Sequence, residues 1–246
     1  MIPKKIHYCW FGRNPLPKVV EECMASWRRV MPEAEIIRWD ESNYDVTAVP
    51  YVAAAYKAKK WAFVSDYVRL DVIYREGGIY LDVDVELLKP LDPLLTDRAF
   101  CGREDELKVN TGLVLAAEAG HPIVRGMRDA YLGYQYLDEK DNFSSPACPV
   151  LQTDYLRPLG LLPMRSGYQD IQGIRVYPQE YFNPVDEFGV PHLTSNSYCL
   201  HHAMASWLPA KWRFFKAIRR AAERVCGPHV LRMLVGVKRI FWAEYK

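Results

Sequence analysis

The sequence predicts an α/β domain in which helices flank a largely parallel sheet. Two apolar segments of strand composition, Lys5–Phe11 and Ile36–Trp39, are separated by a helical segment, Val19–Val30. A long segment of helix composition, Tyr51–Glu76, is followed by an alternating apolar segment, Ile79–Leu88. Strands that alternate with helices are typical of α/β domains, which bind ligands beyond the carboxyl ends of their strands.

The length and composition fit one catalytic domain. The chain has 246 residues, of which 50% are hydrophobic and 13% aromatic, enough for one sizeable core. No leader-like segment opens the chain, and no run reaches the roughly 18 apolar residues of a membrane span. The cysteines form no Cys-x-x-Cys pair, which is typical of buried thiols in a reducing compartment. They are Cys9, Cys23, Cys101, Cys148, Cys199 and Cys226. We therefore expect a cytoplasmic protein.

A strongly basic segment closes the chain. Residues 209–246 contain ten Lys or Arg and two Glu, whereas the whole chain carries only +2, so residues 1–208 are acidic on balance. We expect residues 1–208 to form the catalytic domain. Residues 209–246 are expected to form an amphipathic helical tail that holds the protein peripherally on the inner, anionic face of the membrane. In the alternative interpretation the tail packs on the acidic catalytic domain.

The first predicted strand runs into a loop that begins at Gly12, and the second ends at Asp40. The long helix that follows has few helix breakers and is apolar around most of its circumference, so we expect it to be buried until Gly77-Gly78 ends it. Ser65, Asp66 and Arg69 lie three or four residues apart on this helix and therefore share one side. Alone, they could equally form a salt bridge of purely structural value.

The segment Ile79–Leu88 alternates with a period of two residues. If it is one strand, Asp82, Asp84 and Glu86 point to the same face. Carboxylates at that spacing repel one another unless a cation bridges them, and oxygen ligands suit Mg²⁺ or Mn²⁺. The pattern therefore favours a metal site over a solvent-facing acidic edge strand.

These motifs resemble glycosyltransferase family 32, a group of DXD-motif sugar transferases. The resemblance lies in Ser65-Asp66-x-x-Arg69 and in the run from Gly77 to Asp84. It extends to further segments in the same order: Ile2–His7 with Trp10, Ser26-Trp27, Arg38-Trp39-Asp40, Asn110-Thr111-Gly112, His121-Pro122, His201-His202 and Ser206-Trp207. It implies a GT-A fold, in which a nucleotide-binding mixed sheet carries the DXD motif at a strand end.

The resemblance also implies roles for individual residues. Asp84 would be the main ligand of Mn²⁺ or Mg²⁺, Asp82 would contact the metal or the ribose, and His201 would complete the metal shell. Asp66 and Arg69 would hold the donor sugar and act in catalysis with both motif aspartates. Because His201 and His202 are adjacent, only one ring can face the metal, and its distance from Trp207 favours His201.

The remaining expected donor contacts come from several segments: His7, Trp10, Ser65, Tyr80, Asn110, Ser206 and Trp207. Among them, His7 and Trp10 would line the nucleoside pocket, and Ser206 with Trp207 would close over the diphosphate. His7 could instead be a buried, hydrogen-bonded strand residue. The chain has Ala147-Cys148-Pro149 where relatives often have Gly-Pro, which leaves the acceptor-side role of that loop open.

The function expected from this resemblance is hexose transfer from a nucleotide sugar to a glycan acceptor, with retention of the anomeric configuration. We expect UDP-galactose or UDP-glucose as the donor and a lipid-linked acceptor, in capsule, O-antigen or lipopolysaccharide synthesis; no nucleic acid is expected as a partner. One alternative is a GDP-mannose-dependent mannosyltransferase. Alternatives of other classes are a haloacid-dehalogenase-like phosphatase, in which an Asp-x-Asp also follows an apolar strand, and a non-catalytic nucleotide-sugar-binding module.

Overall fold

A computed structural model describes residues 1–134, 136–138, 140, 142–186 and 190–202. The chain divides into two compact units, one comprising Met1–Pro184 with Leu193–Ala203 and the other Val185–His192 with Met204–Lys246. Within the second unit, the described residues form a short turn in which Val185 pairs with Pro191 and the amide of Asp186 donates to the Val190 carbonyl at 2.9 Å. The expected basic tail and the boundary at residue 208 lie outside the described residues.

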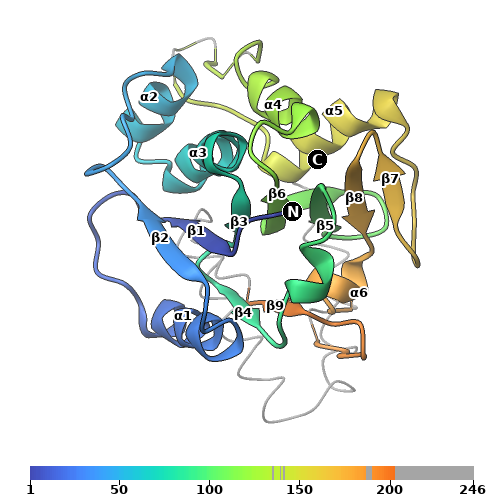
Figure 1. The fold of residues 1–246 in the computed structure, drawn as a ribbon. Helices are drawn as coiled ribbons and strands as arrows, with labels where there is room; N and C mark the ends of the chain where they lie inside the picture. Colours follow the sequence, from blue (N-terminus) through green and yellow to red (C-terminus); the bar gives the residue numbers. More distant parts are fainter. Residues whose placement is uncertain (135, 139, 141, 187–189, 203–246) are drawn as a thin grey trace, which may run out of the picture. The chain divides into compact units, whose positions relative to one another are not determined.

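A seven-stranded mixed sheet forms the centre of the first unit (Figure 1). Its strand order is β2-β1-β3-β6-β5-β8-β7. The bounds are β1 Lys5–Cys9, β2 Glu35–Trp39, β3 Gly78–Tyr80, β5 Ala99–Arg103, β6 Val109–Ala117, β7 Gln169–Ile171 and β8 Ile174–Tyr177. The predicted fold class, a mixed α/β sheet flanked by helices, is confirmed. The expectation of a largely parallel sheet is wrong, because β6 runs antiparallel to both of its neighbours, β3 and β5.

The helices cover both faces of this sheet. Helices α2 to α5 lie on one side, and α1 lies on the other next to a small sheet of β4 and β9 (Figure 1). Their bounds are α1 Lys18–Val30, α2 Pro50–Lys57, α3 Trp61–Glu76, α4 Pro122–Asp129, α5 Cys148–Leu156 and α6 Gln179–Phe182, with 3-10 turns at Asp92–Leu94 and Arg157–Leu159. No helix in the described part of the chain combines the length and the apolar character needed to cross a membrane.

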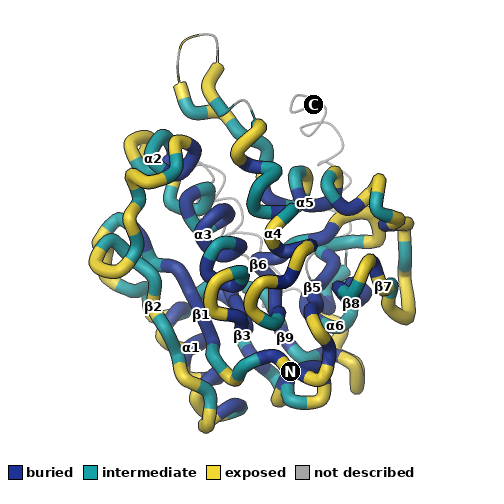
Figure 2. Tube along the Cα trace, turned by 45° about the horizontal axis from the view of Figure 1, so that its top comes forward, coloured by how far each residue is buried: buried dark blue, intermediate teal, exposed yellow. Residues whose placement is uncertain are grey.

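The predicted helix over residues 51–76 is two helices. The chain reverses between α2 and α3 at Lys59, whose φ of 56° is left-handed. Helix α3 and the central strands then form the most buried part of the first unit (Figure 2). Because α3 is buried on most sides, its polar residues must find partners inside the protein.

The alternating segment Ile79–Leu88 is also divided, contrary to prediction. Its first part, β3, belongs to the large sheet, and its second part, β4 (Val85–Leu87), pairs with β9 (Cys199–His201) in the small sheet. A turn at Val83 and Asp84 joins them. The Asp-Val-Asp motif therefore lies where the chain passes from one sheet to the other.

A bulge in β6 faces this turn. Cys101 pairs with Leu115, but Gly102 pairs with Asn110, so the residues from 111 to 114 have no partner in β5. Helix α5 supplies a hydrogen-bond partner to the backbone of β6 beside this bulge, because the Thr153 hydroxyl accepts from the Val109 amide at 2.9 Å. The bulge brings Asn110 and Gly112 to the Asp-Val-Asp turn.

Candidate active site

Two aspartates and a histidine converge at the junction of the two sheets. One potential ligand atom each of Asp82, Asp84 and His201 lies within 4.8 Å of the others. Asp82 follows β3, Asp84 precedes β4, and His201 ends β9 opposite Val85. Nε2 of His201 lies 3.1 Å from Oδ1 of Asp84. Pairing of β9 with β4 thus supplies the histidine that completes a three-residue set.

The neighbouring histidine makes a separate pair. Nε2 of His202 lies 3.0 Å from Oε2 of Glu86, and its amide donates to the Asp84 carbonyl at 2.9 Å. Glu86 therefore does not join Asp82 and Asp84 on one face, contrary to prediction, because the chain turns between the two aspartates and β4. His201 rather than His202 faces the aspartate pair.

The electrostatics of this set favour a cation. Burial raises the pKa of Asp82 and the nearby Asp84 carboxylate adds to the effect, while Arg69 opposes it. Burial by itself would lower the pKa of His201, but the Asp84 and Asp82 carboxylates outweigh it and raise the pKa. A divalent cation would relieve the repulsion between the aspartates and displace the proton shared by His201 and Asp84.

Arg69 holds Asp82 from the side of α3. Its Nη2 lies 3.0 Å from Oδ1 of Asp66 and 3.0 Å from Oδ1 of Asp82. Its guanidinium carbon lies 5.0 Å from the centre of the Tyr80 ring, and the Tyr80 hydroxyl donates to Asp82 Oδ1 at 2.9 Å. Arg69 is only 3% exposed and Asp66 7%, so both lie behind Asp82. Their contact with a donor sugar stays a prediction.

Asn110 and Gly112, at the β6 bulge, lie next to Asp82. The Gly112 amide donates to Asn110 Oδ1 at 2.8 Å, and the Gly112 carbonyl accepts from the Asp82 amide at 2.9 Å. A Cβ added to Gly112 would lie 2.2 Å from Asp82 Oδ2. A larger residue at this position would therefore displace the Asp82 carboxylate, a constraint that sequence reasoning did not identify.

Cys148 is a second residue whose place sequence reasoning missed. Its thiol at the start of α5 lies 3.2 Å from Arg69 Nη1 and 3.7 Å from Asn110 Oδ1. Burial, opposed by Arg69, raises the pKa of the neighbouring Asp66 to about 6. The departure at Ala147-Cys148-Pro149 was the signal that could have located this contact.

His7 supports the sheet instead of lining a pocket. Its side chain is fully buried, with Nε2 2.9 Å from the Gly77 carbonyl and Nδ1 accepting from Trp39 Nε1 at 3.0 Å. A carbonyl can only accept and an indole N–H can only donate, so the ring is neutral with its proton on Nε2. The interpretation of His7 as a buried strand residue fits this geometry, and the expected nucleoside contact does not.

Ser65 and Trp10 have partners within their own segments. The Ser65 hydroxyl donates to the Trp61 carbonyl at 3.1 Å, one turn earlier in α3. Nε1 of the partly buried Trp10 donates to the Asn14 carbonyl at 2.7 Å. Their expected donor contacts stay predictions, as do those of Ser206 and Trp207, which lie outside the described residues.

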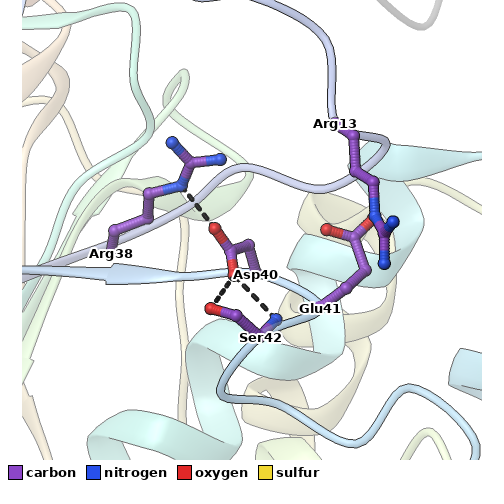
Figure 3. A pocket seen from close by; sticks show the side chains of 5 residues that line it. All are labelled: Arg13, Arg38, Asp40, Glu41 and Ser42. Carbon is purple, nitrogen blue, oxygen red and sulfur yellow. Dashed lines mark hydrogen bonds and ion pairs between the residues drawn. The ribbon is translucent and has the colours of Figure 1, made fainter.

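A polar pocket of about 290 Å³ lies at the carboxyl ends of β1 and β2 (Figure 3). Asp40 accepts hydrogen bonds from Arg38 Nε at 2.7 Å and from the Ser42 hydroxyl at 2.6 Å. Glu41 accepts from the Gly12 amide at 2.7 Å, and Arg13 completes the lining. The pocket shares no residue with the aspartate–histidine set, so the two are separate features at the carboxyl ends of neighbouring strands.

Comparison with known proteins agrees with the geometry of the set. Residues 17–101 match the family described as the glycosyltransferase sugar-binding region containing the DXD motif. The matched residues include α3 and the Asp82-Val83-Asp84 turn. Residues 17–101 are therefore similar to the sugar-binding region of the DXD-motif glycosyltransferases. The predicted resemblance to this group of sugar transferases is thereby confirmed.

Two curated relatives come from Schizosaccharomyces pombe (strain 972 / ATCC 24843). Inositol phosphoceramide mannosyltransferase 3 is 32% identical over 127 residues, covering 50% of this chain and 35% of that protein. Inositol phosphoceramide mannosyltransferase 1 is 29% identical over 110 residues, covering 40% of this chain and 33% of that protein. The chain thus matches only about a third of the length of each. Among solved structures, the PaToxG glycosyltransferase matches with a TM-score of 0.49 and 19% identity, over 64% of this chain and 69% of that one.

Proposed function

We propose that this chain transfers a hexose from a nucleotide-diphosphate sugar to a glycan acceptor with the help of a bound divalent cation. The observation that carries the proposal is that Asp82, Asp84 and His201 lie close together in space. Asp82 and Asp84 belong to the segment, residues 17–101, that matches the DXD-motif glycosyltransferases. Three protein ligands leave coordination positions open for substrate oxygens, as catalytic metal sites require.

The residues of the set fit Mn²⁺, with Mg²⁺ as the second choice. Two carboxylates suit either ion, but a histidine nitrogen is a less usual ligand for Mg²⁺, which prefers oxygen. The cation would supply Lewis-acid stabilisation of the negative charge that develops on the departing diphosphate. Asp82 and Asp84 would hold it, and His201, once deprotonated, would complete the protein ligands.

The other residues would position substrates. Arg69 and Tyr80 fix the orientation of Asp82 through contacts at 3.0 and 2.9 Å, so their main task would be to keep this carboxylate in place. The pocket at the ends of β1 and β2, near Trp10, is where a nucleoside would bind, because ligands of α/β sheets lie at this edge. Ser206 and Trp207 are proposed to close over the diphosphate.

The curated relatives favour a mannosyl donor. Both are named mannosyltransferases, which supports the GDP-mannose alternative over UDP-galactose or UDP-glucose. Retention of the anomeric configuration is proposed from the family resemblance alone. NMR of the purified product would test it, since an α-linked donor should give an α linkage, and a β linkage would remove the chain from the retaining group.

A lipid-linked acceptor and a peripheral membrane location are part of the proposal. The names of the two fungal relatives refer to a lipid acceptor, inositol phosphoceramide, and residues 209–246 are strongly basic. Each Lys or Arg near an anionic surface contributes about 1 kcal/mol, and salt screens the attraction. The full chain should float with anionic liposomes at low salt, whereas a chain ending at Leu208 should not. Equal flotation of both would assign the tail to the catalytic domain.

The decisive assay is a screen of nucleotide sugars with and without Mn²⁺. We expect Mn²⁺-dependent release of nucleoside diphosphate from one donor class, with GDP-mannose tested beside UDP-glucose and UDP-galactose. Binding of a nucleotide sugar without turnover would instead support a non-catalytic binding module. The family match gives no support to the phosphatase alternative, and hydrolysis of a phosphate monoester in the same screen would revive it.

A further inference from the structure

Glu41 lines the pocket at the carboxyl ends of β1 and β2, although no motif marks it (Figure 3). It is partly buried and lies two residues after β2. Its Oε1 accepts hydrogen bonds from the Gly12 amide at 2.7 Å and from the Tyr56 hydroxyl at 3.0 Å. Burial by itself would raise the pKa of Glu41, but the hydrogen bonds that the carboxylate accepts outweigh burial and lower the pKa. The side chain is therefore ionised at neutral pH and is fixed at one of its two oxygens.

The two donors to Glu41 come from a tightly packed corner of the fold. Gly12 follows β1 with a left-handed φ of 92°, and Tyr56 lies in α2. A Cβ at Gly12 would lie 2.6 Å from the Trp61 ring, and this ring packs edge-on against Tyr56 with ring centres 5.1 Å apart. The corner thus holds Oε1 of Glu41 in place before a ligand binds, which lowers the cost of recognition.

The other carboxylate oxygen of Glu41 is available to a ligand. Apart from the residue's own amide, no group in the described part of the chain donates to Oε2. Arg13, which lines the same pocket and is exposed, has no hydrogen-bond or ion-pair partner for its guanidinium among the described residues. By contrast, Asp40 accepts from Arg38 Nε at 2.7 Å and from the Ser42 hydroxyl at 2.6 Å. Glu41 and Arg13 are therefore the pocket residues that have hydrogen-bonding capacity to spare.

The backbone of Arg13 is strained at the same place. Its φ of 56° is left-handed, which is uncommon for a residue other than glycine. Such conformations are costly and concentrate at ligand-binding and catalytic sites. The strain supports a functional role for the Arg13 side chain in this pocket.

A carboxylate and a guanidinium that line one pocket complement a nucleobase with N–H groups and carbonyl oxygens, because a carboxylate only accepts and a guanidinium only donates. Guanine offers the carboxylate two adjacent donors, N1–H and the 2-amino group, and offers the guanidinium two acceptors, O6 and N7. Uracil offers the carboxylate a single ring N–H, and adenine offers it none. Guanine is therefore the base that these two side chains fit best.

We propose that Glu41 and Arg13 recognise guanine, so that the sugar donor of this chain is a GDP-sugar. The inference rests on the proposed function, which assigns the nucleoside to this pocket. Strand β1 lies between β2 and β3, and two strand spacings of the sheet amount to about 10 Å. A nucleoside diphosphate is long enough to have its base in the pocket beyond β2 and its diphosphate at the aspartates that follow β3.

The test compares Glu41→Gln with the matched control Asp45→Asn. The glutamine keeps one oxygen that accepts from Gly12 and Tyr56, but it replaces the other oxygen by an amino group that donates. Asp45 lies in the same loop, is exposed, does not line the pocket and accepts from the Thr47 amide at 2.8 Å. Calorimetry with Mn²⁺ measures the affinities for GDP, UDP and inosine diphosphate, which lacks only the 2-amino group of guanine. Thermal unfolding monitors the fold.

The unmodified chain should bind GDP roughly tenfold more tightly than inosine diphosphate, and more tightly than UDP by at least the same factor. Glu41→Gln should bind GDP roughly 10–100-fold more weakly and lose its preference for GDP over inosine diphosphate, while UDP binding changes by less. Arg13→Ala should weaken GDP and inosine diphosphate equally, by roughly tenfold, because both bases carry O6 and N7. Asp45→Asn should match the unmodified chain throughout.

Three results would overturn the inference and leave the proposed function standing. The first is UDP binding by the unmodified chain that is as tight as GDP binding, a result that does not depend on how any variant folds. The second is an equal loss of GDP and UDP affinity in Glu41→Gln, which would make Glu41 a contact of the ribose or a support of the loop. The third is unchanged GDP affinity in Arg13→Ala. Failure of the unmodified chain to bind any nucleoside diphosphate with Mn²⁺ would instead overturn the proposed function, and this inference with it.

Discussion

His7 and His201 both lie on strands near the Asp-Val-Asp turn, yet their surroundings move their pKa values in opposite directions. Burial lowers the pKa of His7 to about 4. At His201 the carboxylates of Asp84 and Asp82 outweigh burial, and the pKa is raised. The partners of a histidine, more than its burial, thus separate a residue that supports the sheet from one that can bind a metal.

The different partners assign the two rings different tasks. Nε2 of His7 donates to a carbonyl and Nδ1 accepts from an indole, so no lone pair is left for a ligand. His201 instead directs Nε2 at a carboxylate, 3.1 Å away, that would itself bind a cation. Both residues belong to motifs of the same family resemblance, which therefore does not distinguish the two tasks.

The largest expected effect comes from removing the metal-facing histidine. His201→Ala should lower the Mn²⁺-dependent kcat by at least ~10²-fold, because the cation loses a ligand beside the departing diphosphate. His202→Ala is the matched control, since His202 pairs with Glu86 at 3.0 Å and is not part of the set. Steady-state kinetics of both variants measures this difference, and an equal loss in both would contradict the assignment of His201.

A single added methyl group at Gly78, beside His7, and at Gly112, beside Asp82, tests whether the two regions have different tasks. A Cβ at Gly78 would lie 2.8 Å from His7 Nε2 and one at Gly112 would lie 2.2 Å from Asp82 Oδ2. Gly78→Ala, at a φ of 105°, should cost about 1–3 kcal/mol of unfolding free energy. Gly112→Ala should weaken Mn²⁺ binding about tenfold by displacing Asp82. Urea unfolding and Mn²⁺ titration of both variants measure these effects. If Gly78→Ala weakened Mn²⁺ binding and Gly112→Ala lowered only stability, the distinction between a structural region at His7 and a metal site at Asp82 would be wrong.

The pH dependence of the unfolding free energy tests the lowered pKa of His7. Its pKa is about 4 in the folded chain against 6.5 as a free side chain, so below pH 6.5 the unfolded state binds the proton more readily. The stability that neutral His7 contributes is present above pH 6.5 and is lost as the pH falls toward 4. Between pH 7 and 5 the unmodified chain should lose about 2 kcal/mol more than His7→Gln. Equal losses in urea unfolding would show that His7 titrates normally.

The smallest effect is expected from a substitution of Trp39, the hydrogen-bond partner of His7. Trp39→Phe removes the N–H that donates to His7 Nδ1 at 3.0 Å, which should cost about 1–2 kcal/mol. Nδ1 could then accept a proton, so the pKa of His7 should rise. NMR titration of the imidazole measures this pKa, and an unchanged value would mean that burial alone sets it.

The sequence predicted the local elements of the site but not their long-range arrangement. Nearby residues sufficed to predict the strand at β1 and the stop at Gly77-Gly78, and to single out Asp82 and Asp84 as candidate metal ligands. They did not predict the turn at Val83 and Asp84, because β4 joins a strand more than a hundred residues later, β9. Period-two alternation says which side chains share a face only while the strand continues.

The same limit applies to the rest of the site. The break at Lys59 has no glycine or proline to mark it, and the β6 bulge depends on pairing with both β3 and β5. His201 could be identified by resemblance, and the register of β4 with β9 explains why it, and not His202, meets Asp84.

The central claim is that Asp82, Asp84 and His201 form one divalent-cation site, and direct Mn²⁺ binding tests it. Electron paramagnetic resonance titration in the presence of nucleoside diphosphate should give one bound Mn²⁺ per chain. Asp84→Asn should weaken this binding by at least ~10²-fold, whereas Glu86→Gln, whose carboxylate pairs with His202, should leave it unchanged. Equal Mn²⁺ affinity in Asp84→Asn and the unmodified chain, or turnover that persists in excess chelator, would contradict the account.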